Sequence, residues 1–142
     1  MPKLNLFIDT NIIIDLLADR IPFSNAAYQI FKKENLKRWN LYTSSNSILT
    51  AYYIVAKNSN LYNAKKAIKI IMNRLTIQDI SKKGILNALN SKIDDLEDAS
   101  QEECATNIGK IDYIITRDKK GFKHSKFKVI SSDELIVLDQ NN

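Results

Sequence analysis

The chain has 142 residues, of which 44% are hydrophobic, so it can bury a core of ordinary size, and we expect residues 1–142 to form a single domain. Three glycines and two prolines leave little room for a flexible linker. The apolar runs at residues 12–14 and 70–72 are too short to cross a membrane, and the first residues lack the pattern of a signal peptide. Cys104, the single cysteine, excludes an internal disulfide and a paired-cysteine metal site, and together these features predict a cytoplasmic protein.

Basic residues outnumber acidic ones, with 21 Lys and Arg against 16 Asp and Glu, which gives a net charge of +5. The excess gathers between Arg117 and Lys128 and favours a polyanionic partner such as RNA or DNA. Lys, Asn and Ile are frequent throughout, so the charge also fits a general bias in composition. The residues of this segment for which we expect nucleic-acid contacts are Arg117, Lys119, Lys120 and Lys123.

Strand-like and helix-like segments alternate along the chain. Short apolar or alternating runs predict strands at residues 4–8, 39–43, 75–77, 112–116 and 126–130. Apolar residues at helical spacing predict helices at 13–17, 24–31, 47–55, 64–71, 81–89 and from about residue 95, with a last helical turn capped by Ser132. No tandem hairpin signal interrupts this alternation. It therefore predicts an α/β domain with a mainly parallel sheet and helices on both faces.

Carboxylates stand where two of the predicted strands end. Asp9 closes the first strand, Asp118 follows the fourth, and an acidic helix start at residues 94–98 lies between them. In an open parallel sheet, side chains beyond the carboxyl ends of the strands converge on one crevice. Two carboxylates about 4 Å apart repel by roughly 4 kcal/mol at an effective dielectric constant near 20, so a cluster of them needs a cation or a raised pKa. Oxygen ligands alone favour Mg²⁺ or Mn²⁺ over zinc, and beside a basic surface they predict phosphodiester hydrolysis by a metal-activated water.

Each of these acids also has a structural explanation. Asp9 stands where a helix begins and fits an N-cap, whereas Asp118 fits a turn. Asp95 and Asp98 fit a cap followed by an acidic third helical residue. Taken singly, these explanations are at least as good as a catalytic one. The catalytic interpretation rests on the shared edge of the predicted sheet.

Other chemistries find less support in the sequence. His124 is the single histidine and supplies no Ser-His-Asp set, and Cys104 fits helix packing better than nucleophilic attack. Three scattered glycines exclude a glycine-rich phosphate loop. A phosphotransfer domain of the haloacid dehalogenase or receiver type would also place an aspartate after the first strand. The dehalogenase type needs a second aspartate where Asn11 stands, and the acidic pair of a receiver is not evident.

Four segments, taken in order, resemble the motifs of PIN domains. Residues 7–12 (FIDTNI) resemble the opening motif, and residues 95–99 (DLEDA), followed by the small pair at 104–105, resemble the central one. Residues 113–118 (YIITRD) resemble the last motif, a strand that leads to Thr-x-Asp or Thr-x-Asn. Residues 130–135 (ISSDEL) match the usual tail. The segments span nearly the whole chain, and the resemblance is greatest to the VapC-like toxins of bacterial toxin–antitoxin pairs.

The resemblance implies a three-layer α/β/α sandwich with a five-stranded, mainly parallel sheet, and the activity of a Mg²⁺- or Mn²⁺-dependent endoribonuclease. The catalytic and metal-binding carboxylates that it implies are Asp9, Asp98 and Asp118, with Asp95 as a further candidate ligand. Thr10 and Asn11 would position the first turn, and Thr116 would hydrogen-bond a metal-bound water. The implied partners are an RNA substrate, a cognate antitoxin protein and a second copy of the chain.

The chain departs from the family pattern at two positions. PIN domains usually carry a glutamate early in the helix after the second strand, and the alignment of residues 43–53 places Thr50 there, although some subgroups also carry an uncharged residue. Asp95 and Glu97 are extra carboxylates nearby, and Gly121 stands where relatives often have an aspartate. We therefore expect weaker metal binding, with Thr50 in a supporting role. The alternative is a catalytically weak PIN domain that binds RNA or a protein without cutting.

Overall fold

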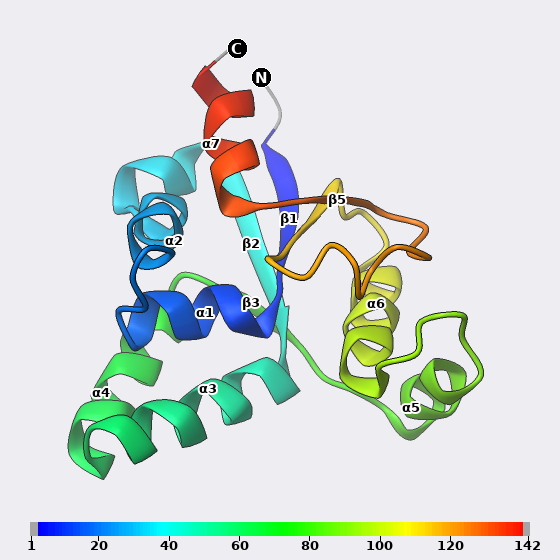
Figure 1. Ribbon diagram of the computed structural model, residues 1–142, viewed down its shortest axis with the longest axis horizontal. Helices are drawn as coiled ribbons and strands as arrows, with labels where there is room; N and C mark the ends of the chain where they lie inside the picture. The colour runs from blue at the N-terminus through cyan, green and yellow to red at the C-terminus, as the bar shows by residue number, and fades with distance from the viewer. Residues whose placement is uncertain (1–2, 141–142) are drawn as a thin grey trace.

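The computed structural model describes residues 3–140, in which strands and helices alternate as predicted (Figure 1). The elements in chain order are β1 (Leu4–Ile8), α1 (Thr10–Leu17), α2 (Ser24–Phe31), the 3₁₀ helix η1 (Lys33–Lys37), β2 (Trp39–Ser44), α3 (Ser45–Asn58), α4 (Leu61–Met72), β3 (Thr76–Gln78), α5 (Lys82–Leu89), α6 (Leu96–Ile108), β4 (Tyr113–Ile115), β5 (Lys128–Ile130) and α7 (Ser132–Gln140). None of the helices in this described part is long and apolar enough to cross a membrane.

Five strands form one sheet in the order β3-β2-β1-β4-β5, and every neighbouring pair is parallel. The chain starts at the central strand β1, moves outward to β2 and β3, and then returns to the other side of β1 for β4 and β5. The order therefore reverses beside β1. In open α/β sheets, ligands bind at such a reversal, just beyond the carboxyl ends of the strands.

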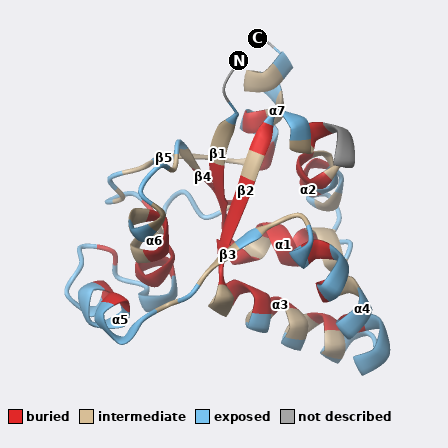
Figure 2. Cartoon of the chain, turned by 180° about the vertical axis from the view of Figure 1, so that it is seen from behind, coloured by how far each residue is buried: buried red, intermediate tan, exposed pale blue. Residues whose placement is uncertain are grey.

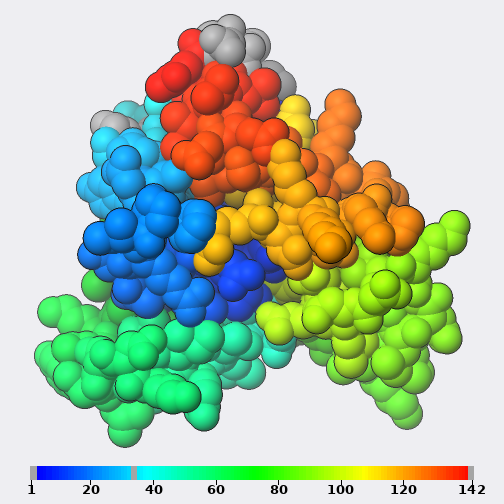
Figure 3. Space-filling model, in the orientation of Figure 1, coloured from blue at the N-terminus to red at the C-terminus, as the bar shows by residue number. Residues whose placement is uncertain are grey.

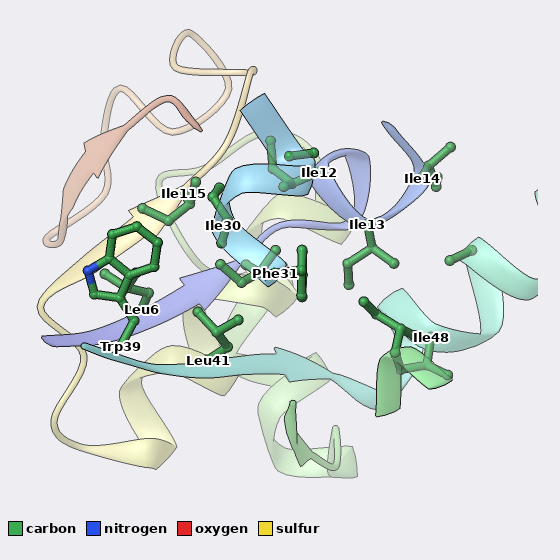
Figure 4. Packing of buried hydrophobic residues seen from close by; sticks show 14 of the residues in the cluster. Leu6, Ile12, Ile13, Ile14, Ile30, Phe31, Trp39, Leu41, Ile48 and Ile115 are labelled. Atoms are coloured by element: carbon green, nitrogen blue, oxygen red, sulfur yellow. The ribbon is translucent and has the colours of Figure 1, made fainter. Parts of the chain in front are cut away.

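Alternate residues of β1 serve opposite faces of the sheet. Leu6 and Ile8 belong to a buried cluster with α1, α2, α3, α4 and α7, whereas Phe7 belongs to a second cluster with α5 and α6 (Figure 4 shows the first). Figure 1 accordingly shows α1, α2 and α7 on one side of the strands and α5 and α6 on the other. In Figure 2, β1 and β2 are buried for most of their length, and the outer sides of α4 and α5 are exposed. The predicted α/β/α sandwich with a five-stranded sheet is confirmed.

The clearest differences from the predicted elements lie at the starts of two helices. α3 begins at Ser45 rather than at Ser47, because the Ser44 hydroxyl caps the helix and accepts from the Ser47 amide over 3.0 Å. The last helix is capped by Ser131 rather than Ser132, and it continues to Gln140 instead of ending after one turn. Ser131 and Glu134 exchange hydrogen bonds of 3.1 Å in a capping box. In both cases several serines stand side by side, so local preference did not identify which hydroxyl caps the helix.

Candidate active site

The parallel register of β1 and β4 brings Asp9 beside Thr116. Ile8 pairs with Ile115 in the ladder, and the Asp9 amide donates to the Ile115 carbonyl oxygen over 2.9 Å. The next residue of each strand therefore emerges at the same edge of the sheet. There the Thr116 hydroxyl donates to Asp9 Oδ2 over 2.7 Å. Both side chains are buried, so this hydrogen bond is shielded from water.

The same hydroxyl also connects Asp9 to Asp118. Thr116 Oγ1 accepts from the Asp118 amide over 2.9 Å while it donates to Asp9. Asp118 Oδ1 in turn accepts from the Gly121 amide over 2.9 Å, which turns the chain back towards the sheet. The sequence predicted that Thr116 would hydrogen-bond a metal-bound water. In the structure its hydroxyl also sets the position of the Asp118 backbone relative to the Asp9 carboxylate, and the contact with a metal-bound water stays a prediction.

Asp98 reaches this point from α6. Asp95 caps the helix, since its Oδ1 accepts from the Asp98 amide over 2.9 Å, and Asp98 lies in the first turn. The Asp98 side chain hydrogen-bonds to that of Asp118. Gly121 packs against both carboxyl groups, because a Cβ at this position would lie closer than 3.0 Å to an oxygen of each. The structure thus brings together the three predicted carboxylates, Asp9, Asp98 and Asp118, at the carboxyl edge of the sheet.

The structural and catalytic explanations of these acids turn out to be compatible. Asp9 is the N-cap of α1, with its Oδ1 accepting from the Thr10 amide over 2.9 Å, and Asp95 is the N-cap of α6. In each cap, one carboxylate oxygen accepts a hydrogen bond from a backbone amide of its own helix. The helix starts therefore place the carboxyl groups, and the same groups remain available at the edge of the sheet.

Burial and mutual repulsion raise the pKa values of two of these carboxyls. For Asp98, burial has the largest effect, followed by the charge of Asp9 and the hydrogen bond with Asp118, and together they raise its pKa to about 8. Burial also raises the pKa of Asp9, although hydrogen bonds from Thr116, Gln101 and the Thr10 amide oppose the rise. A hydrogen bond between two carboxyl groups needs a proton on one of them. The site therefore holds a proton near neutral pH when no cation neutralises it.

Sequence analysis missed a buried polar network behind Asp9. Gln101 Nε2 lies 2.7 Å from Ser47 Oγ and 3.3 Å from both Asp9 Oδ1 and Thr10 Oγ1. The hydroxyls of Thr10 and Ser47 are themselves 2.6 Å apart and hydrogen-bonded. Side chains from α1, α3 and α6 thus form one network, in which Gln101 donates to Oδ1 of Asp9. The available signal was the spacing: Gln101 follows Asp98 by three residues and shares its helix face.

Two adjoining hollows share the carboxyl groups of Asp95, Asp98 and Asp118. The inner hollow, of about 300 Å³, is also lined by Asp9 and Thr50 and by parts of α1 and α3. The basic hollow, of about 280 Å³, extends along the segment after β4. Figure 3 shows the recess: the dark-blue start of α1 lies sunk between the orange segment after β4 and the green α3. We refer to the two hollows together as the crevice. The remaining predicted residues that line the inner hollow are Thr10 and Asn11.

The four basic residues predicted to contact nucleic acid separate into two pairs. Lys120 and Lys123 line the basic hollow, where His124 joins them. Arg117 instead pairs with the buried Asp15, and Lys119 pairs with Glu134. Neither Arg117 nor Lys119 is among the described residues that line the two hollows. The sequence did not distinguish these pairs, because all four residues lie within seven positions of one another.

The donor atoms of the crevice suit a hard cation with several bound waters. Among the side chains that the structure describes, no three His, Cys, Asp or Glu are grouped so that they could hold a metal ion by themselves. Asp98 and Asp118 do offer adjoining carboxylate oxygens, and Gly121 leaves room beside them. Mg²⁺ usually keeps several waters and binds proteins through one or two carboxylates. The residues present therefore fit such an ion, with Asp98 and Asp118 as ligands and Asp9 beside them.

Comparison with known proteins agrees with this fold. A model of the PIN domain family matches residues 5–120 of the chain. The chain is similar to the protein named Ribonuclease VapC1 from Aquifex aeolicus (strain VF5), with 28% identity over 137 residues, which cover 91% of each sequence.

Among solved structures, the fold is similar to those of VapBC2 and VapC20. VapBC2 from Rickettsia felis, solved bound to a DNA fragment from its promoter, matches with a TM-score of 0.66 at 17% identity and covers 90% of this chain and 98% of that one. VapC20 from Mycobacterium tuberculosis, described as a sarcin-ricin loop cleaving toxin, matches with a TM-score of 0.67 at 14% identity and covers 86% and 95%. At these identities the likeness concerns the fold.

Proposed function

The chain belongs to the PIN domain family, and on that premise we propose that it is a metal-dependent endoribonuclease and the toxin of a toxin–antitoxin pair. The observation that carries the proposal is the connection of Asp9, Asp98 and Asp118 at one crevice. The names of two similar proteins support it, since one is called a ribonuclease and the other a sarcin-ricin loop cleaving toxin.

In the proposed site, Asp98 and Asp118 would hold Mg²⁺ or Mn²⁺, with Asp9 next to them and Asp95 as a further ligand through the oxygen that does not cap α6. The bound ion supplies an activated water as nucleophile and stabilises the leaving oxygen of the phosphodiester. The chain itself supplies position. Thr116 holds one oxygen of Asp9 and the network around Gln101 holds the other, so the carboxylate cannot turn away from the crevice.

The proposed substrate contacts are the lysines of the basic hollow. Lys120 and Lys123 lie next to Asp98 and Asp118 along the segment after β4. Ammonium groups at this place attract the phosphates of RNA, and such contacts weaken as salt rises. The acidic centre alone would repel the same phosphates. The lysines therefore offset part of that repulsion and guide the strand to the carboxylates.

The direct experiment measures cleavage of a labelled single-stranded RNA by the purified protein with Mg²⁺, with Mn²⁺ and with EDTA. We expect cleavage that EDTA abolishes and that added metal restores. Asp118→Asn should lose cleavage but stay folded, because Asp118 is exposed and the amide keeps an oxygen for the Gly121 amide. Asp79→Asn is the matched control, since Asp79 also follows a strand but does not line the described crevice. Undiminished cleavage by Asp118→Asn would contradict the proposed site.

A second candidate function is RNA binding or protein binding without cleavage. The observation that favours it is Thr50, which lines the inner hollow. If Thr50 stands at the position of the family's usual glutamate, as the resemblance implies, the site has one carboxylate fewer. Under this alternative, fluorescence anisotropy would show RNA binding, while no cleavage would appear with either metal.

A cognate antitoxin protein is the partner that we propose, because a structural neighbour from Klebsiella pneumoniae is a toxin–antitoxin complex. A homodimer and a cytoplasmic location complete the proposal. A search for a small protein encoded next to this chain, followed by its co-expression with the chain, tests the partner. Complex formation that abolishes ribonuclease activity is the expected result, and sedimentation of the free chain as a monomer would count against the dimer.

A further inference from the structure

The basic side chains that line the crevice all stand at one end of it. Lys120, Lys123 and His124 line the basic hollow, whereas no Lys, Arg or His is among the described residues that line the inner hollow. Arg117 and Lys119 do not extend the cationic end, since each is engaged by a carboxylate elsewhere. The crevice is therefore electrostatically one-sided, with the carboxylates Asp98 and Asp118 at the boundary.

A phosphate meets very different surroundings at the two ends. In the inner hollow it would face Asp9 and Glu97, and no Lys, Arg or His among the described lining residues opposes them, while a divalent ion held by Asp98 and Asp118 balances only the charges of those two carboxylates. Like charges about 4 Å apart repel by roughly 4 kcal/mol at an effective dielectric constant near 20. In the basic hollow, Lys120 and Lys123 offset the nearby acids Asp94 and Asp95. Phosphates of a bound strand are thus tolerated at the basic end and excluded from the inner end.

The inner hollow offers neutral surfaces instead. Ile14 and Ile54 supply apolar contact area, and Asn11 and Thr50 supply an amide and a hydroxyl. These groups suit a ribose and a base, which are uncharged and combine flat apolar faces with hydrogen-bonding edges. Gly121 lies at the boundary beside the two carboxyl groups. Because glycine has no side chain, this residue does not separate the two ends of the crevice.

We propose that the crevice holds single-stranded RNA asymmetrically. Phosphates on one side of the scissile bond contact Lys120, Lys123 and His124, and on the other side the strand turns a ribose and base into the inner hollow. This inference rests on the proposed ribonuclease function and specifies how its substrate lies. It requires that cleavage depends on the charge of flanking phosphates on one side of the scissile bond only.

The test replaces single phosphates of an RNA oligonucleotide with neutral methylphosphonates. The cleavage site is first mapped on the unmodified strand, and one replacement is then placed at each of the two linkages on either side of it. We expect kcat/KM to fall by about two- to fivefold for replacements on one side, the range for an exposed charge pair, and to stay unchanged for those on the other.

Two lysine variants connect this effect to the basic hollow. In the double variant Lys120→Gln, Lys123→Gln, neutralising the sensitive linkages should no longer lower kcat/KM by much. The slope of the logarithm of the RNA-binding constant against the logarithm of the salt concentration should become less steep by about 0.7 per lost contact. Lys119→Gln removes one charge from the same segment outside the crevice and should keep the wild-type pattern. Equal losses on both sides, or a pattern that the double variant leaves intact, would overturn the inference while leaving the ribonuclease function in place. Absence of any metal-dependent cleavage of the unmodified RNA would overturn the proposed function itself, and the inference with it.

Discussion

Arg117 and Asp15 form a two-point ion pair that joins the two segments carrying Asp118 and Asp9. Arg117 Nε donates to Asp15 Oδ2 over 2.7 Å, and its Nη2 donates to Asp15 Oδ1 over 2.9 Å. The Asp15 side chain is 1% exposed and that of Arg117 is 28% exposed. The guanidinium also lies over the Phe23 ring, 3.9 Å from its centre. The pair thus braces α1 against the turn after β4, whereas the sequence alone favoured an RNA contact for Arg117.

Breaking this brace should destabilise the protein without changing its phosphate contacts. Arg117→Met leaves the buried Asp15 carboxylate unpaired, and we expect a loss of about 2 to 4 kcal/mol in the free energy of unfolding, measured with urea. Arg117→Lys should lower the free energy of unfolding by less, because a lysine keeps the charge but not the two-point geometry. Removing both charges, with Asp15→Leu added to Arg117→Met, should restore much of the stability.

The salt dependence of RNA binding separates the brace from a substrate contact. We expect Arg117→Met to keep the wild-type salt slope under conditions where it is folded, since Arg117 does not line the described crevice. A slope that falls by about 0.7 would instead assign Arg117 a phosphate contact.

The raised pKa of Asp98 predicts a pH dependence of stability in the metal-free protein. Between its ordinary pKa of 3.8 and the value of about 8 in the fold, the folded protein holds a proton that the unfolded chain has lost. Stability must therefore fall as pH rises through this window. Asp9 acts in the same direction, since burial raises its pKa as well.

Asp98→Asn should flatten this dependence. With EDTA present, we expect the melting temperature of the wild type to fall between about pH 5.5 and pH 8, and that of Asp98→Asn to fall less. Asp79→Asn controls for the removal of one carboxylate outside the crevice. A variant slope as steep as that of the wild type would show that the Asp98 carboxyl does not hold the proton.

Thr50 should determine how strongly the site binds metal. It lines the inner hollow with Asp9 and Asp98, so a glutamate there would add a carboxylate to the crevice. Thr50→Glu should lower the melting temperature of the metal-free protein and tighten Mn²⁺ binding by about tenfold, or roughly 1.4 kcal/mol. Thr50→Gln, similar in size but uncharged, is the control. Equal metal-dependent rises in melting temperature for the two variants would show that the carboxylate at this position does not reach the ion.

Gly121 should be required for the spacing of the carboxyl pair. A Cβ there would overlap oxygens of both Asp98 and Asp118, so Gly121→Ala must push at least one of them away. A displacement of about 1 Å at a reacting centre can lower the rate by roughly 100-fold, and we expect a loss of this order in kcat. Gly84→Ala is the control, because its Cβ would meet Ser81 Oγ at an ordinary 3.4 Å within α5 and should stabilise that helix by about 0.5 to 1 kcal/mol. Wild-type kcat for Gly121→Ala, with unchanged circular dichroism, would contradict this role.

Local patterns in the sequence predicted an α/β domain with a mainly parallel sheet and acids at its carboxyl edge, and the resemblance to PIN domains selected Asp9, Asp98 and Asp118 among those acids. Apolar runs and helical spacing depend on near neighbours in the chain, so all five strands could be located from them. Asp9 and Asp118 follow strands, and Asp98 lies in the first turn of a helix, so their shared edge followed from the topology of a parallel sheet.

The connections among these residues depended on contacts between distant segments. Gln101 meets Asp9 from 92 residues away and Arg117 meets Asp15 from 102 residues away, and neither pairing has a local signature. The division of the basic segment has the same cause, since Lys119 pairs with Glu134 while Lys120 lines the crevice. Which side chain faces which hollow is set by strand register and helix packing. A shift of one position in strand register turns a side chain to the opposite face of the sheet. Only the packed sheet and its helices determine that register.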